Sequence, residues 1–361
     1  MNDLPESAGG ATGPLVAGPS TPSTRPSPAS EPQPQVPRLP SPSEGVAALR
    51  ELQRSIGASV IGFEETVRLL LIALLSDGHV LLEGVPGLAK TYLVRTLAQN
   101  LALSFRRIQF TPDMLPSDIV GNVVVDPRTQ DLLYREGPIF SNVILADEIN
   151  RAPPKVQSAL LEAMQERQVT VDGKSHPLPR PFIVIATQNP VEQEGTYPLP
   201  EAELDRFLFR VLLTYPSEAA ELEMLRTRLG ASDETTGPAV LGGAEIERLR
   251  RVAAETYVDP DLLSYLNQVV RRTREDERIL LGASPRAGVQ FLRAVRASAL
   301  LDGRPYATPD DVKRLALPIF NHRLVLRPDV LAQQLSGGAD AIERMLVSVV
   351  QGLLGTVPAP R

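Results

Sequence analysis

The chain lacks several of the residues on which common protein chemistry depends. Its 361 residues include no cysteine and no tryptophan, and the three histidines are His79, His176 and His322. The absence of cysteine excludes disulfide bonds, thiolate zinc sites, iron–sulfur clusters and a cysteine nucleophile. A metal site built from histidine would need all three rings to converge, so we expect oxygen atoms to hold any metal.

Neither a strong net charge nor a long apolar run is present. The 37 basic and 43 acidic residues give a net charge of −6, which removes an overall attraction to nucleic acid or anionic lipid. The most apolar run, Leu69–Leu75, has seven residues, whereas about 20 are needed to span a bilayer. The first six residues carry two acids and lack the basic start of a signal peptide. We therefore expect a cytoplasmic protein with no transmembrane segment.

The composition divides the chain into three parts. Eleven of the 34 prolines fall at or before Pro42, among serine, threonine, glycine and glutamine. Such a segment cannot bury enough apolar surface to fold, so we expect residues 1–43 to be a disordered tail. The tail is interpreted as a tether, with a proline-motif docking segment as the alternative. The length fits about two further domains, which we place at 44–214 and 215–361.

Hydrophobic periodicity predicts an α/β core followed by helices. Apolar residues recur at helical spacing over 44–57 and 64–76. Short apolar runs then alternate with helical stretches, which is typical of a five-stranded parallel sheet with helices on both faces. Strand-like runs stop after Tyr215, and an all-α domain is expected there. The expected strands are 79–83, 105–110, 143–146, 182–186 and 207–213, and the expected later helices are 244–256, 260–274, 286–301, 309–320 and 341–353.

A glycine loop between the first strand and a helix predicts a phosphate-binding P-loop. Its backbone N–H groups would surround phosphates at a helix N-terminus. Lys90 would contact the β- and γ-phosphates, and the Thr91 hydroxyl would bind Mg²⁺. Ala89 replaces the usual second glycine, and we expect the loop to persist if this position does not need a positive φ. The predicted ATP-binding residues are Gly84, Val85, Pro86, Gly87, Leu88, Ala89, Lys90 and Thr91.

Polar residues at the ends of two further strands predict the rest of the site. Asp147 and Glu148 follow the apolar run from Val143, and they could hold Mg²⁺ and orient the attacking water, respectively. Asn189 follows the next strand and could hydrogen-bond the γ-phosphate and that water. The alternatives are a solvated strand end for the two acids and a turn former for Asn189.

The order of motifs resembles the MoxR family of AAA+ ATPases over roughly residues 45 to 355. The matching segments are GVPGLAKT, LADEINRAPP, IATQNP, PEAELDRF and GASPRA. The resemblance implies Walker A, Walker B and sensor 1 roles for the residues above, and alanine is common in the family where Ala89 stands. It also implies that Arg206 is an arginine finger and Arg286 is sensor 2, with Arg151 a weaker candidate for a contact across a subunit interface. Residues 115–139 resemble the insert in helix 2, and 169–178 resemble the hairpin before sensor 1.

The resemblance implies Mg²⁺-dependent ATP hydrolysis in a homo-oligomeric ring, expected to be a hexamer, in the bacterial cytoplasm. An arginine finger cannot serve its own site, so it implies a ring. The family suggests chaperone-like remodelling or maturation of protein clients, including von Willebrand factor A domain proteins. The alternatives are the motor subunit of a metal-chelatase type complex and a nucleotide-gated scaffold with little turnover. Remodelling of DNA is disfavoured by the net acidity, and the histidines are assigned no chemistry.

Overall fold

The computed structural model describes residues 42–85, 87–189, 195–229, 239–332 and 339–360. The predicted tail lies outside this part except at its end, where helix α1 (Pro42–Ser59) already begins. All described residues belong to one compact unit. Among them, no helix is long and apolar enough to cross a membrane.

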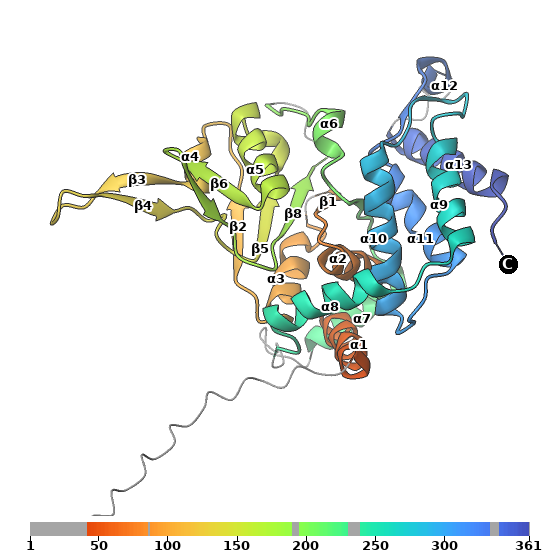
Figure 1. Cartoon of the computed structure of the whole chain (residues 1–361), viewed down its shortest axis with the longest axis horizontal. Helices are drawn as coiled ribbons and strands as arrows, with labels where there is room; N and C mark the ends of the chain where they lie inside the picture. The colour runs from red at the N-terminus through yellow and green to blue at the C-terminus, as the bar shows by residue number, and fades with distance from the viewer. Residues whose placement is uncertain (1–41, 86, 190–194, 230–238, 333–338, 361) are drawn as a thin grey trace, which may run out of the picture. The chain divides into compact units, whose positions relative to one another are not determined.

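The central sheet has five parallel strands in the order β2-β5-β8-β1-β9 (Figure 1). Strand β1 lies between β8 and β9, so that Val80 pairs with Ile185 on one side and with Phe209 on the other. Because all pairs are parallel, the carboxyl ends of the strands meet at one edge. The predicted five-stranded sheet is confirmed as β1 (Val80–Glu83), β2 (Phe105–Gln109), β5 (Val143–Asp147), β8 (Ile183–Gln188) and β9 (Phe209–Leu212).

Both faces of the sheet are covered by helices, as continuous apolar strands require. Val143 and Leu145 of β5 point into one hydrophobic cluster, and Ile144 and Ala146 point into another. The first cluster contains α1, α2 and α3, and the second contains α5. The bounds of these helices are α2 (Glu64–Leu75), α3 (Lys90–Asn100) and α5 (Pro154–Glu166).

Two antiparallel hairpins interrupt the core where the sequence predicts them. One extends away from the sheet (Figure 1), with Val125 opposite Leu132 near its tip. The other turns at Asp172 and Gly173, both with positive φ. The elements in and around them are α4 (Pro116–Val120), β3 (Gly121–Val125), β4 (Leu132–Glu136), β6 (Gln168–Val171), β7 (Lys174–Pro177), the 3₁₀ helix η1 (Ile149–Arg151) and α6 (Glu201–Leu204).

The C-terminal part consists mainly of helices, with four elements that the sequence analysis did not anticipate, one of which is the five-residue helix α12 (Pro328–Ala332). Helix α7 (Glu218–Leu229) is exposed on nearly all sides and so has no apolar stripe to reveal it. Strands β10 (Ile279–Leu281) and β11 (Val325–Leu326) are too short for a visible alternation. The remaining helices are α8 (Gly243–Glu255), α9 (Pro260–Arg272), α10 (Pro285–Leu301), α11 (Pro309–Phe320), α12 (Pro328–Ala332) and α13 (Ala339–Thr356).

Helices α8 and α10 pack against α2, so the later helices share a core with the sheet. Leu71 of α2, Leu249 of α8 and Phe291 of α10 belong to one buried cluster. Arg68 of α2 also donates to Asp302 at the end of α10, over 2.6 Å. The position of α10 is therefore fixed relative to the strands, although the predicted boundary between residues 214 and 215 stays a prediction.

Candidate active site

The loop after β1 has the tight backbone that the sequence predicts. Gly87 has φ +88°, and a Cβ atom on Gly84 would lie 2.9 Å from the carbonyl oxygen of Leu213. Ala89 has φ +55° and precedes the first residue of α3, Lys90. The position therefore does adopt a positive φ, and the loop persists although the condition set in the sequence analysis is not met. Alanine adopts the left-handed conformation here, at a cost of roughly 1 kcal/mol compared with glycine.

Lys90 folds back across the mouth of this loop. Its Nζ donates to the carbonyl oxygen of Gly84 over 2.8 Å and to that of Gln188 over 3.5 Å. The lysine therefore links the loop to the end of β8, where the predicted sensor residue stands. Thr91 follows it in the first turn of α3. Pro86, also predicted to bind ATP, lies outside the described residues.

Asp147 ends β5 at the same edge of the sheet, and its side chain is 11% exposed. Its Oδ1 accepts a 2.5 Å hydrogen bond from Thr187, and its Oδ2 accepts from Arg107 Nε and Nη2 at 3.0 and 2.5 Å. Carboxylate and hydroxyl oxygens suit Mg²⁺, which takes few protein ligands and retains phosphates and water. The donor set of Asp147 and Thr91 fits this ion. No group of three or more acids and histidines able to hold a metal is found in the described ranges.

Glu148 projects from the first residue after β5, where its φ is +59°. Its backbone N–H donates to the Thr187 hydroxyl over 3.0 Å, so one threonine contacts both acidic residues. Its Oε2 accepts from Gln109 Nε2 over 2.8 Å and lies 3.1 Å from Arg151 Nε. The predicted interface candidate Arg151 therefore contacts an acid of its own chain. The carboxylate remains partly exposed and can reach a water molecule.

Asn189 directly follows β8 and is 5% exposed. Its neighbour Gln188 pairs with Glu83 of β1, next to the P-loop. The sheet thus brings Lys90, Asn189, Asp147 and the P-loop to one edge. Sequence reasoning missed Arg107, Gln109 and Thr187, which contact the two acids. The polar positions 107 and 109 in an otherwise strand-like run were the available signal.

Arg206 and Arg286 lie at the opposite edge of the sheet. Both line a cavity with Asp77, Gly78 and His79, at the amino end of β1. The P-loop begins six residues later, which corresponds to roughly 20 Å of extended chain. The two predicted arginines are brought together, but away from the P-loop of their own chain.

Asp205 joins the segments that carry these two arginines. Its Oδ2 accepts from the hydroxyl of Ser284, which caps α10 just before Arg286. Its Oδ1 accepts from Nε of Arg323 over 2.7 Å. Arg323 also donates to the carbonyl oxygens of Phe207 and Leu208. One carboxylate therefore connects the residue before Arg206 with the start of α10.

Burial of the groups around this carboxylate affects their ionisation. Burial lowers the pKa of Arg323 to about 10, against the opposing effect of Asp205. Burial also holds the pKa of His322 and of His79 well below the usual value, so both rings are neutral. His79 accepts from the Val184 N–H, consistent with the predicted core role. Sequence reasoning assigned no role to Arg323 or Asp205, because their connection depends on segments more than 100 residues apart.

Together, the fold and this edge of the sheet define a P-loop nucleotide-binding module of the AAA+ type. Residues 79–209 match a family described as the ATPase family associated with various cellular activities, and residues 271–344 match an AAA lid domain. These matched ranges contain the P-loop, both acids, Asn189 and Arg206 in the first, and Arg286 in the second.

Similar proteins narrow the class. The chain is 43% identical to the chaperone MoxR1 of Mycobacterium tuberculosis over 88% of this chain and 87% of that protein. It is 45% identical to YeaC of Bacillus subtilis over 82% of this chain and 92% of that protein. A solved structure from Cytophaga hutchinsonii, assigned as an ATPase, is 39% identical, has a TM-score of 0.80 and covers 89% of this chain and 97% of that one. The chain belongs to the MoxR family of AAA+ ATPases.

Proposed function

We propose that this protein hydrolyses ATP in a homo-oligomeric ring, a hexamer, and uses turnover to remodel protein clients in the cytoplasm. The observation that carries the proposal is the separation of the site into two halves. The P-loop edge holds Lys90, Asp147 and Glu148, whereas Arg206 and Arg286 lie at the other end of β1. An arginine side chain cannot span roughly 20 Å. The P-loop edge of one protomer therefore needs Arg206 and Arg286 from a neighbouring protomer.

The P-loop edge supplies binding and activation of water. Lys90 would leave its carbonyl partners and contact the β- and γ-phosphates of ATP. Mg²⁺, which Thr91 and Asp147 would hold, supplies positive charge beside the phosphates. Glu148 would orient and polarise the water that attacks the γ-phosphorus, while Asn189 hydrogen-bonds that water. The bond between γ-phosphorus and the β,γ-bridging oxygen breaks, and ADP and phosphate leave.

The arginine edge of the neighbouring protomer supplies charge stabilisation. Arg206 would contact the γ-phosphate during transfer, a role worth about 10³ to 10⁵ in rate in other nucleotide hydrolases. Arg286 starts α10 beside it, so loss of the γ-phosphate can be transmitted to the helical region. Because Asp205 connects the two segments, the two arginines would approach the neighbour's nucleotide as one unit.

The client class rests on the relatives rather than on the geometry. One similar protein is named a chaperone, which supports remodelling of proteins over a metal-chelatase motor. We include proteins with von Willebrand factor A domains among the proposed clients. Turnover of ATP separates this proposal from a nucleotide-gated scaffold, for which hydrolysis is unnecessary.

A complementation experiment tests action between protomers. Arg206→Ala and Glu148→Gln would each be purified alone and also co-expressed, with mixed assemblies verified by native mass spectrometry. Each pure variant should hydrolyse ATP slowly. Mixed assemblies should regain activity, because some intact Glu148 sites then face an intact Arg206.

The concentration dependence of the wild-type protein provides the control. Its ATPase rate per protomer should rise as the ring assembles. Mixed rings no more active than either parent, together with a rate that does not depend on concentration, would show that Arg206 does not act across an interface.

A further inference from the structure

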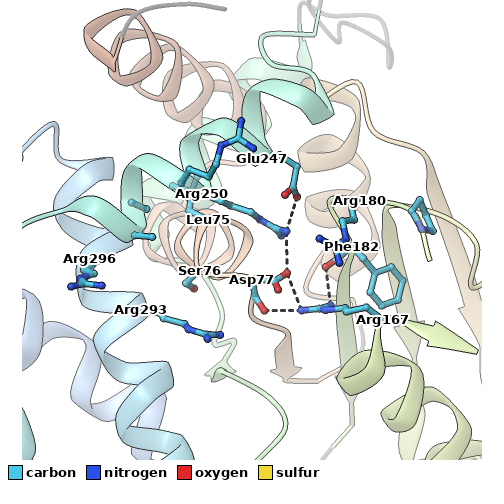
Figure 2. Close-up of a pocket in the computed structure, with 14 residues that line it drawn as sticks. Leu75, Ser76, Asp77, Arg167, Arg180, Phe182, Glu247, Arg250, Arg293 and Arg296 are labelled. Atoms are coloured by element: carbon cyan, nitrogen blue, oxygen red, sulfur yellow. Dashed lines mark hydrogen bonds and ion pairs between the residues drawn. The ribbon is translucent and has the colours of Figure 1, made fainter. Parts of the chain in front are cut away.

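A second cavity, with a volume of about 420 Å³, adjoins the arginine edge. It is bounded by α8, α10, the turn after α2 and the segment that leads into β8 (Figure 2). Arg206 and Arg286 do not line it. Its charged lining residues are Arg167, Arg180, Arg250, Arg251, Arg293, Arg296, Asp77 and Glu247.

The two acids are already engaged by two of the arginines. Asp77 Oδ1 accepts from Arg167 over 2.9 Å and from Arg250 over 3.0 Å, and Glu247 accepts from Arg250 over 2.8 Å. Figure 2 shows that these contacts lie between Arg293 and Arg296 on the left and Arg180 on the right. The other four arginines make no ion pair within the part of the chain that the structure describes; they are Arg180, Arg251, Arg293 and Arg296.

Two buried donors at the cavity also lack a partner. Nε of Arg296 and Nη2 of Arg250 are inaccessible and donate to no acceptor among the described residues. A buried N–H group without an acceptor destabilises the folded protein. Both atoms are covered by protein atoms, so a ligand in the cavity would meet the accessible guanidinium nitrogens of the lining arginines instead.

Positive charge is in excess at this cavity, as it is at the adjoining one. The chain as a whole carries more acids than bases, yet here six arginines face two acids. Burial lowers the pKa of Arg167, and the guanidinium groups of Arg250 and Arg180 lower it further, while Asp77 raises it. The arginines thus repel one another, and a bound anion would relieve that repulsion.

The shape and chemistry favour a small phosphorylated ligand. Guanidinium groups come from the segment before β8, from α8 and from α10, so they can meet oxygens on several sides of one ligand. Planar guanidinium groups bind phosphate oxygens in pairs. The cavity volume lies near the lower end of the range for small-molecule sites, about 300–1,000 Å³. It is larger than the volume that a single phosphate would fill. Leu75, Phe182 and Ala253 add an apolar wall.

We propose that this cavity binds a small molecule with at least two phosphate groups, at a site separate from the P-loop. The site adjoins the arginine edge, because Asp77, Arg167 and Arg293 line both cavities. A ligand here can therefore influence how that edge meets a neighbour. The proposal does not rest on ATP hydrolysis, and its test is a direct measurement of binding.

The experiment titrates inorganic pyrophosphate into the full-length Lys90→Ala variant by calorimetry at fixed salt. This background weakens the P-loop site and removes a neighbour's nucleotide as the source of phosphate. The test variant adds Arg180→Gln and Arg251→Gln, which lie on different walls and are exposed. The matched control adds Arg54→Gln and Arg226→Gln, whose side chains are 73% and 65% exposed and do not line the cavity. Circular dichroism verifies that each variant is folded.

The expected result is one pyrophosphate per protomer in the background and in the control, with affinity at least about tenfold weaker in the test variant. No binding in the Lys90→Ala background would overturn the proposal, because the cavity is intact in this variant. Its arginines could then meet phosphate only from a neighbour's nucleotide. Equal losses in the test and control variants would also overturn it, because they would indicate diffuse attraction by surface charge. Neither of these outcomes bears on whether the protein hydrolyses ATP, so this proposal can fail while the proposed function stands.

Discussion

The two edges of the central sheet are assembled differently, although both surround the short strand β1. At the carboxyl edge, the P-loop and Asn189 directly follow buried strands, and Asp147 is the last residue of another. At the amino edge, Arg206 and Arg286 are placed by the partly buried side chain of Asp205 and the buried side chain of Arg323. Each residue of the first edge is placed by the strand next to it in the sequence, and this edge is suited to bind a nucleotide. The second depends on long-range contacts and lies away from the P-loop of its own chain.

The largest effect should come from removing the cation that acts at a distance. Arg206→Ala should lower the ATPase rate by about 10³ or more, because transition-state charge loses its stabilisation. ATP affinity should change less than about twofold, since the P-loop is about 20 Å away. Steady-state kinetics and a fluorescent ATP titration measure the two quantities. Arg271→Ala, an arginine 65% exposed on α9, is the control and should alter neither.

Lys90→Ala should produce the converse pattern. Loss of the charged donor should weaken ATP binding by roughly 10- to 100-fold, as expected for a charge-assisted hydrogen bond of about 1.5–3 kcal/mol. Calorimetry measures the affinity, and Lys155→Ala, an exposed lysine on α5, is the control. Unchanged affinity for ATP in Lys90→Ala would contradict the P-loop assignment.

The difference between the edges also explains what the sequence could reveal. One strand ends at Asp147 and is followed by Glu148, and another leads into Gly84 and Lys90. Each of these patterns can be recognised from about ten consecutive residues. The three inner strands β1, β5 and β8 were equally visible, because buried parallel strands are continuous apolar runs. These features needed no knowledge of distant contacts.

The amino edge shows the limit of the same reasoning. Arg323 lies 118 residues from Asp205, and nothing in either segment indicates that they meet. The cluster of arginines around the second cavity is equally hidden, because 33 of the 37 basic residues are arginine and each one alone resembles a solvated charge. The backbone of Ala89 was left open for a different reason: residue type predicts only a preference for φ, whereas the loop imposes its value.

Asp205→Asn should have an intermediate effect at the arginine edge. The amide keeps the shape but removes the charge that accepts from Arg323 and Ser284, so the two arginines should be held less rigidly. We expect the ATPase rate to fall about tenfold, the scale of one charge-assisted hydrogen bond, with unchanged ATP affinity. A substitution that only destabilised the protein would instead lower both the ATPase rate and the binding of ATP, in proportion to the unfolded fraction. Asp310→Asn, at a position 91% exposed, is the control.

The smallest effect concerns the backbone of the P-loop. Ala89→Gly should raise the free energy of unfolding by up to about 1 kcal/mol, because glycine adopts φ +55° without the Cβ penalty. The greater freedom of glycine in the unfolded chain offsets part of this gain. Ala244→Gly, an exposed residue in the first turn of α8, should instead destabilise by about 0.5–1 kcal/mol. Urea unfolding of the nucleotide-free proteins measures both changes. If the two substitutions destabilise alike, Ala89 is not held in the left-handed region in solution, and the P-loop edge is less preorganised than the arginine edge it must meet.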